Sequence, residues 1–281
     1  MPDNPTSVET FPLPLPGHRL LTLTGKDAFA FAQAQFMNDV TALADGQWQW
    51  NGWLTAKGRL IALFALLRVD PETLWLLLPD YPPAELADGL KKYVFRSKVV
   101  LTPRDDLQAS GLWDAAPGTD LREFQQHGDD AVSLSWPGGR RIDINPTSAA
   151  DVPADDATAL RWREADLRAG IPRLDASQSE QWTPQQLSLG HLQAYSVKKG
   201  CYPGQEIVAR THFLGQAKRG LVLLELGGEA KAGDEVTGDG RAIGQVIASA
   251  GAIAQAVLPL DGTDAPLSVG QQPAHRLPIT H

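Results

Sequence analysis

The sequence has few of the residues that build several common kinds of site. Its single cysteine, Cys201, excludes an intrachain disulfide and a cysteine-rich zinc or iron–sulfur centre held by one chain. The six histidines show no metal-ligand spacing, so we expect no stably bound metal. The apolar runs are also short. The run Leu60 to Leu67 ends at Arg68, which is far less than a membrane-spanning helix needs.

The first residues, MPDNPTSVETFPLPLPGH, carry acids and prolines. A signal peptide requires a basic start and an apolar stretch in this place. We therefore expect a cytoplasmic protein with no membrane partner.

There is no surplus of positive charge: 25 Lys and Arg stand against 33 Asp and Glu, a formal net charge of −8. Strong, nonspecific nucleic-acid binding requires neutralisation of phosphates, so this balance argues against it. The basic residues are nevertheless concentrated in two segments, Lys91, Lys92, Arg96 and Lys98 in the first and Lys198, Lys199, Arg210, Lys218 and Arg219 in the second. Such segments in an acidic protein favour a confined anion site, and the alternative is a pair of solvated helix faces.

A chain of 281 residues is expected to form two or three packed units. Apolar periodicity predicts strands at 18–25 and 47–69, the latter a hairpin, and a helix over 26–37 with Phe29, Ala32 and Phe36 on one face. Further helices are predicted over 82–98 and 157–170, with a short helical piece after the polar loop 175–184. Gly138–Gly139 predicts a second hairpin.

After Arg219 the pattern changes to short strands separated by Gly and Asp turns, which predicts a small β-barrel or sandwich. The chain is thus expected to be an α+β body followed by a β module.

The segment from Lys198 to Glu206, KKGCYPGQE, is the most informative part of the sequence. Gly200 and Gly204 permit backbone conformations closed to other residues, and Pro203 stiffens the turn between them. A helical pattern resumes at Gln205 and continues to about Thr211, so Cys201 is expected in a tight turn just before a helix.

In that position the helix dipole and Lys198, Lys199 or Arg210 would favour the thiolate form of Cys201, a nucleophile or redox-active sulfur. The alternative is an inert cysteine that packs as a small hydrophobic residue. We interpret His212 as a surface or structural residue and Glu206 as a first-turn acid favoured by the dipole.

The string KKGCYPGQE resembles the signature of YgfZ proteins, K-G-C-Y-x-G-Q-E, formed here by Lys199, Gly200, Cys201, Tyr202, Gly204, Gln205 and Glu206. The following IVARTHFLGQAKRGL and the upstream LTGKDAFAFAQAQFMNDV, AKGRL and LKKYVFRSKV also resemble segments of that family. The resemblance covers most of the chain and is weakest in the leader and over residues 105–155.

The family is related to the glycine-cleavage aminomethyltransferases, and the resemblance implies their fold: a body of mixed sheets and helices with a C-terminal barrel. It implies an N-terminal α+β folate-binding region over 1–155, a helical and motif segment completing that body over 156–218, and a barrel over 219–281. Tetrahydrofolate is the implied ligand, with contacts from Trp162, His18, Lys199, Tyr202 and Arg210. At His18 the family has a tryptophan, and from the sequence alone Trp162 is equally a core residue.

The implied function is support of iron–sulfur cluster assembly or repair in enzymes, including those that methylthiolate tRNA, through Cys201. The implied partners are iron–sulfur enzymes or cluster-assembly proteins. One alternative is a folate-dependent aminomethyl transferase, and another is a non-catalytic folate-binding module. Against the transferase, Arg168 occupies the position of a family glutamate, and the folate-polarising aspartate has no securely placed equivalent.

Overall fold

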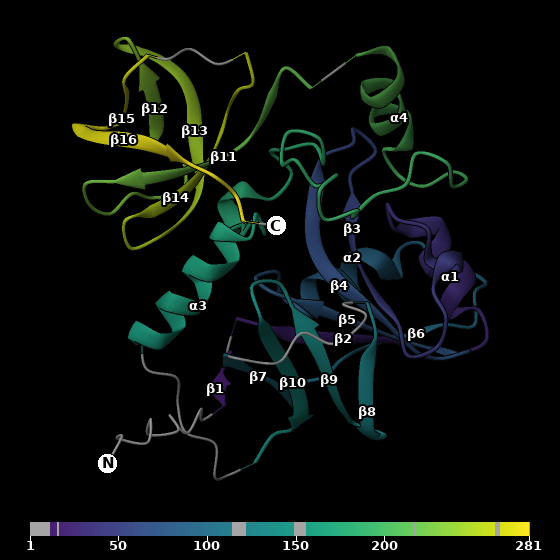
Figure 1. Ribbon diagram of the computed structural model, residues 1–281. Helices are drawn as coiled ribbons and strands as arrows, with labels where there is room; N and C mark the ends of the chain where they lie inside the picture. The colour runs from purple at the N-terminus through teal and green to yellow at the C-terminus, as the bar shows by residue number, and fades with distance from the viewer. Residues whose placement is uncertain are drawn as a thin grey trace, which may run out of the picture.

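The computed structural model describes residues 12–15, 17–113, 122–148, 156–215, 217–261 and 265–280, and most of the proline-rich leader lies outside them. Three β assemblies carry the fold (Figure 1). One is a five-stranded sheet in the order β3-β4-β5-β2-β6, here called sheet B. Its strands are β2 (Arg19–Thr24), β3 (Trp48–Leu54), β4 (Leu60–Asp70), β5 (Thr73–Leu78) and β6 (Val100–Pro103).

The second assembly, sheet A, has the order β1-β7-β10-β9-β8. Its strands are β1 (Leu13–Pro14), β7 (Leu107–Trp113), β8 (Phe124–Gly128), β9 (Ala131–Trp136) and β10 (Arg140–Pro146). The predicted hairpin at Gly138–Gly139 joins β9 to β10, and both glycines have positive φ, as a tight hairpin turn requires.

The third assembly is a closed barrel in the order β11-β14-β13-β12-β15-β16, which confirms the predicted C-terminal barrel. Its strands are β11 (Arg219–Leu226), β12 (Glu235–Gly238), β13 (Arg241–Ala250), β14 (Ile253–Pro259), β15 (Leu267–Val269) and β16 (Gln272–Leu277). Closure pairs every strand with two neighbours, so no edge of this sheet is left open.

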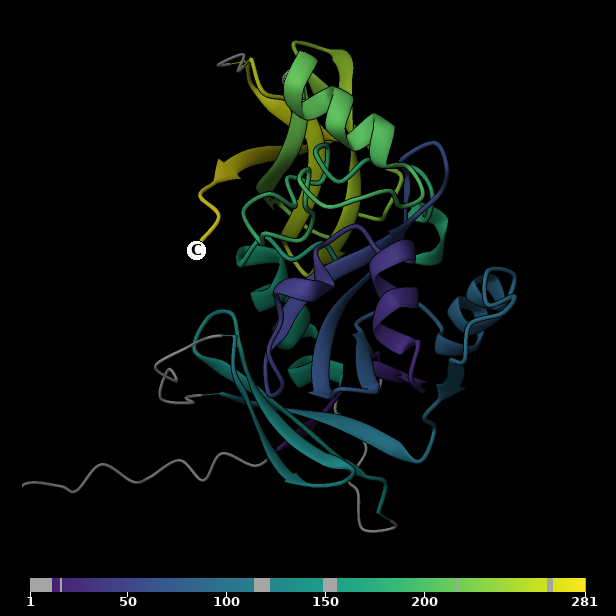
Figure 2. The same ribbon diagram turned by 90° about the vertical axis from the view of Figure 1, so that its right-hand side faces the viewer.

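Sheet B is apolar on both faces. Its strands carry consecutive apolar residues, and alternate residues of a strand point to opposite sides. On β5, Leu74 and Leu76 pack with helices α1 (Ala28–Gln35) and α2 (Pro83–Lys91), whereas Trp75 and Leu77 join the larger core shared with sheet A. The helices therefore cover one face of sheet B, and sheet A lies against the other (Figures 1 and 2).

Helix α3 (Asp156–Arg168) connects the barrel to the two sheets (Figure 1). Its Arg163 donates through Nε to the Ser249 carbonyl of β13 at 3.1 Å. From β14, the buried Gln255 donates to the carbonyls of Leu167 and Ile171 at the end of the helix, at 2.9 and 3.3 Å. These bonds give the barrel a defined position on the body.

Three sequence predictions need correction in detail. Helix α1 buries Phe31 with Ala28 and Ala32, while Phe29 is only partly buried beneath the guanidinium of Arg68. Helix α2 ends at Lys91 and turns follow, and the positive φ of 31° at Phe95 excludes a right-handed helix that continues to residue 98.

The short helical piece predicted after the polar loop forms turns instead, with Ser188 and Gln193 at positive φ. The last helix, α4 (Gln205–Leu214), begins where predicted and runs further; the 3-10 turns η1 (Val40–Ala42) and η2 (Ala176–Gln178) complete the described elements. No helix among the described residues is long and apolar enough to cross a bilayer.

Candidate functional site

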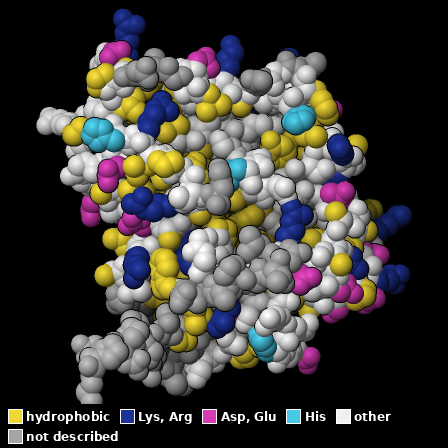
Figure 3. Space-filling view, viewed as in Figure 1, with side chains coloured by type: hydrophobic (Ala, Val, Ile, Leu, Met, Phe, Trp, Pro, Cys, Tyr) yellow, Lys and Arg dark blue, Asp and Glu magenta, His cyan; other side chains and the backbone are white. Residues whose placement is uncertain are grey.

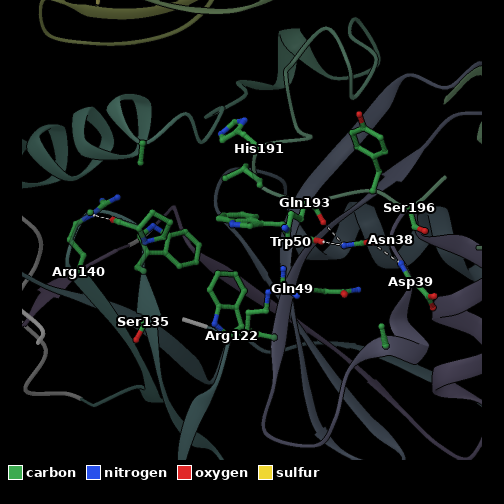
Figure 4. Close-up of a pocket in the computed structure, with 18 of the residues that line it drawn as sticks. Asn38, Asp39, Gln49, Trp50, Arg122, Ser135, Arg140, His191, Gln193 and Ser196 are labelled. Atoms are coloured by element: carbon green, nitrogen blue, oxygen red, sulfur yellow. Dashed lines mark hydrogen bonds between the residues drawn. The ribbon is translucent and has the colours of Figure 1, made fainter. Parts of the chain in front are cut away.

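A cavity of about 790 Å³ opens where sheet A, sheet B and the segment before the cysteine motif meet. One wall is the loop after α1 together with β3, and the opposite wall is the β9–β10 hairpin (Figure 4). The third wall is the 191–198 segment. Its lining residues are Asn38, Asp39, Ala42, Trp48, Gln49, Trp50, Arg122, Ser135, Trp136, Pro137, Gly138, Gly139, Arg140, Ala169, His191, Leu192, Gln193, Tyr195, Ser196, Val197, Lys198 and Thr280.

Three tryptophans form the apolar part of the lining. Trp48 and Trp50 lie two residues apart on β3 and therefore share a face of the strand. Trp136 at the end of β9 stacks on Trp48, with ring centroids 5.8 Å apart and planes inclined by 15°. Its ring also lies 4.9 Å from that of Trp50. The side chains are only 5%, 5% and 1% exposed, so most of their surface packs on one another and a small aromatic area is left for a flat ligand in the cavity.

Two hydrogen-bond donors at this wall have no partner within the described part of the chain. They are Nε1 of Trp48 and Nε2 of Gln49, and both atoms are shielded from solvent. A buried donor without a partner costs roughly 1–3 kcal/mol. Both residues line the cavity, so a ligand whose acceptors reached these atoms would remove that cost.

Asn38 holds the two sides of the cavity together (Figure 4). Its side-chain amide donates to the Trp50 carbonyl at 2.9 Å and to the Gln193 carbonyl at 2.7 Å. Its own backbone N–H donates to Oδ1 of the buried Asn51 at 2.8 Å. The loop after α1 is therefore fixed to β3 and to the 191–198 segment at the same point.

The charged residues of the lining are mostly basic: Arg122, Arg140 and Lys198 against Asp39. Hydrogen bonds from Thr41 hold the pKa of Asp39 below its usual value. A bond from Gln33 acts in the same direction, and desolvation acts against them. These bonds all end on Oδ1 of Asp39, from Gln33 Nε2 at 3.0 Å and from Thr41 Oγ1 at 2.6 Å, so they do not occupy its Oδ2. A basic lining suits an anionic ligand.

A buried charge network stabilises the hairpin wall from behind. Asp166 of α3 is fully buried and accepts hydrogen bonds from Trp136 Nε1 at 2.9 Å and Arg173 at 2.8 Å. It also forms an ion pair with the buried Arg140 at 2.8 Å. Burial alone would raise the pKa of Asp166, but the two guanidinium groups keep it below the usual value. Arg173 extends the network to Asp80.

His18 lies behind Trp136, with ring centroids 5.9 Å apart in an edge-to-face arrangement. Burial, with Arg173 acting in the same direction, lowers the pKa of His18 to about 3. Its Nε2 has no partner among the described residues. His18 is therefore a neutral ring that supports the tryptophan wall and does not reach the cavity.

The cysteine motif follows directly on the cavity wall, since Lys198 lines the cavity and Cys201 is exposed beyond it. Gly204 precedes α4 with φ +79°, and a Cβ there would come within 2.6 Å of the Thr55 carbonyl and 2.7 Å of Gly58. The C-terminal end of the bend is therefore packed on the β3–β4 turn, three residues after the exposed Cys201. Arg210 lies on the exposed side of α4.

Lys199 and Tyr202 point inward from this bend. The Lys199 ammonium donates to the carbonyls of Phe36 and Asn38 at 2.6 and 3.0 Å and lies 5.0 Å from the centre of the Tyr202 ring. Burial lowers the pKa of Lys199 to about 8, against the opposing effect of Asp39. Burial also raises the pKa of Tyr202, whose hydroxyl donates to the Ser196 carbonyl at 3.2 Å.

The residues predicted to contact folate do not line the cavity. His18, Lys199 and Tyr202 are buried behind its walls, and Arg210 is exposed on α4. Trp162 is 1% exposed, with its ring against Gly111 of β7 and 4.4 Å from the Arg140 guanidinium. Contact of these side chains with folate therefore stays a prediction; in this structure they pack in or behind the walls, and other residues line the cavity.

Sequence reasoning missed Trp48, Trp50 and Trp136, as well as Gln49 and Asn38. The alternating tryptophans of QWQWNGW, on the same side of a predicted strand, were a signal for an aromatic surface. Nothing in the sequence indicated that Trp136, from a distant hairpin, would stack on them.

Comparisons with known proteins agree with this architecture. Residues 218–278 match the family model described as CAF17, C-terminal beta-barrel domain. The structure is similar to that of the glycine cleavage system aminomethyltransferase T from Bartonella henselae, with a TM-score of 0.71 and 16% sequence identity. The similarity covers 94% of this chain and 84% of that protein. The family resemblance and fold class predicted from the sequence are thereby confirmed: this chain has an aminomethyltransferase-like fold whose C-terminal barrel matches the CAF17 C-terminal barrel model.

Proposed function

We propose that this chain binds a reduced folate in the tryptophan-lined cavity and supports iron–sulfur cluster assembly or repair in other enzymes through Cys201. The observation that carries the first part is the stacked tryptophan wall with two buried, unpartnered donors. The family of the barrel and the aminomethyltransferase-like fold fit a folate-binding role.

The groups of the cavity fit the parts of a folate. A pterin is flat and carries acceptor atoms, which suits the faces of Trp48 and Trp50 and the free donors of Trp48 and Gln49. The glutamate tail carries carboxylates, which suit the cations Lys198 and Arg122 at the lining. When bound, tetrahydrofolate supplies a carrier for one-carbon units.

Cys201 is the chemical part of the proposal. It is exposed and close in sequence to the cavity wall, and its bend is packed at Gly204, three residues further on. An exposed thiol can serve as a nucleophile, a redox group or a transient ligand for a cluster passed to a client enzyme. The client enzymes, including tRNA-methylthiolating ones, belong to this proposal.

The aminomethyl transferase alternative is less well supported. Among the described residues of the lining the one carboxylate is Asp39, whose Oδ1 is bound by Thr41 and Gln33 and whose pKa is held below its usual value. Arg168, which stands where the transferases have a glutamate, is paired with Glu164 at 2.8 Å. The one acid in the described lining is therefore an ionised carboxylate, which suits a general acid poorly.

Titration of tetrahydrofolate against tryptophan fluorescence under anaerobic conditions tests ligand binding. We expect the wild type to bind and Trp48→Phe, which keeps a ring but removes the donor, to lose about 5- to 20-fold in affinity. Trp53→Phe is the matched control, because Trp53 is on the same strand but packs in the opposite core. Absence of binding to the wild type, or equal losses in both variants, would contradict the assignment of the cavity.

The role of Cys201 is tested separately with Cys201→Ser. The variant should bind tetrahydrofolate with unchanged affinity and fail to restore iron–sulfur enzyme activity in cells that lack the wild-type chain. Full restoration by Cys201→Ser would reject the proposed role of the sulfur while leaving the folate site intact.

A further inference from the structure

The segment 91–100, between α2 and the edge strand β6, forms an exposed surface outside the cavity. It is defined by Lys91, Lys92, Tyr93, Phe95, Arg96, Lys98 and Val100, and we call it the basic aromatic patch. In Figure 2, α2 and the blue loop after it project from the body of the molecule. None of these residues lines the cavity.

Large apolar side chains are exposed on this patch. Phe95 is 89% exposed, Val100 61% and Tyr93 49%. Phe95 has the most exposed ring among the described large hydrophobic residues, and its backbone φ of 31° lies in a region that bulky residues rarely adopt. Within the described part of the chain the ring contact given for Phe95 is with the Arg96 guanidinium, 5.3 Å from the ring centroid, which leaves most of the ring in water. Such an outlier is a reason to look for an external contact.

The patch is also the first cationic segment of the sequence. Lys92, Arg96 and Lys98 are exposed, and Lys91 is paired only with the exposed Asp88. Lys26 adds a fifth exposed cation, since its neighbours Gly25 and Asp27 contact the backbone of Lys98. In contrast, the lysines and arginines on the face shown in Figure 3 are scattered among other side chains.

We propose that the basic aromatic patch docks an acidic segment of a partner protein that carries at least one large apolar side chain. Exposed aromatic residues and arginine are typical of the energetically important centre of protein interfaces, and surrounding cations guide an acidic partner to it.

The charge of the rest of the molecule favours a polypeptide over nucleic acid. The whole chain carries −8, so with the patch cations set aside the remainder is more negative still. A nucleic acid long enough to extend beyond the patch by more than the Debye length, about 8 Å, would meet a repulsive surface. A short acidic segment confined to the patch would not.

Selection from a random 12-residue peptide library on the immobilised full chain, with depletion on Phe95→Asn/Arg96→Glu, tests the proposal. We expect the selected peptides to be enriched in Asp and Glu with one aromatic or leucine side chain. Their affinity should fall about tenfold or more in the double variant and should weaken with added salt. Phe95→Asn should fold normally, because asparagine tolerates positive φ better than phenylalanine.

The control variant is Phe213→Ala/Lys231→Glu, which changes an exposed aromatic residue on α4 and an exposed lysine of the barrel region. It should bind the selected peptides as the wild type does. The proposal is overturned if selection yields no peptide that distinguishes the patch variant, or if a 12-nucleotide oligouridylate binds the patch more tightly than the peptides. Phe95-dependent self-association in sedimentation velocity would also overturn it, in favour of a second copy of the chain.

Discussion

Replacing His18 with glutamine tests the electrostatics behind the tryptophan wall. In the native chain, burial and the cations Arg173 and Arg140 hold the pKa of His18 near 3, against 6.5 for an unperturbed histidine. As the pH falls through about 6.5 the unfolded chain binds a proton at His18, whereas the native chain does not do so until about pH 3. Stability is therefore lost as the pH falls through this window.

The size of the loss follows from the shift. At pH 5 the pH lies roughly 1.5 units below the pKa of histidine in the unfolded chain. Proton binding there lowers the free energy of unfolding by about 2 kcal/mol relative to pH 7. The carboxylate Asp166, whose pKa is depressed below the usual value of 3.8, contributes only at lower pH, so the interval from 7 to 5 isolates the histidine.

Urea denaturation at pH 7 and pH 5 measures this difference. The wild type should lose about 2 kcal/mol more than His18→Gln over the interval, because glutamine does not titrate. Comparing each protein with itself at two pH values cancels the packing change that the substitution causes. His275→Gln, at an exposed position on β16, controls for the replacement of a histidine outside the core. Equal pH dependence of the wild type and His18→Gln would refute a neutral, buried His18.

Three further predictions concern the walls of the cavity. Asp166→Asn leaves the buried Arg140 and Arg173 without their shared carboxylate. It should lower the free energy of unfolding by about 3–5 kcal/mol in denaturant titrations. Asp88→Asn, at an exposed ion pair, is the control and should have little effect. Gly111→Ala places a Cβ at 2.5 Å from the Trp162 ring and should destabilise the chain by about 1–3 kcal/mol. Gly215→Ala is the control, because nothing lies within 4 Å of an added Cβ there and its φ of −160° is extended, and it should change stability little. Lys199→Met removes the donor to the carbonyls of Phe36 and Asn38, which hold the loop after α1. It should weaken tetrahydrofolate binding by about 3- to 10-fold in the fluorescence titration. Lys198→Met removes only a charge at the lining, so its loss of affinity should disappear at high salt.

Much of the fold could be predicted from local pattern. The hairpin at Gly138–Gly139, the helix over α3, the start of α4 at Gln205 and the strand-rich end after Arg219 all depend on turn residues and periodicity within short windows. The cysteine bend was predictable for the same reason, since Gly200, Pro203 and Gly204 are adjacent in sequence. The glycine spacing predicts a turn there. The structure shows that Gly204 of this turn packs against Gly58.

The composition of the cavity wall was not predictable in this way. Trp48 and Trp136 are far apart in the chain and meet only because sheets A and B pack face to face. The same packing decides that Lys199 and Trp162 turn inward and that Phe95 remains in water. Sequence alone thus determined the elements and the cysteine-bearing bend, because these depend on neighbouring residues. Tertiary structure alone decided which side chains face the cavity, because that depends on contacts between segments whose relative positions no local pattern encodes.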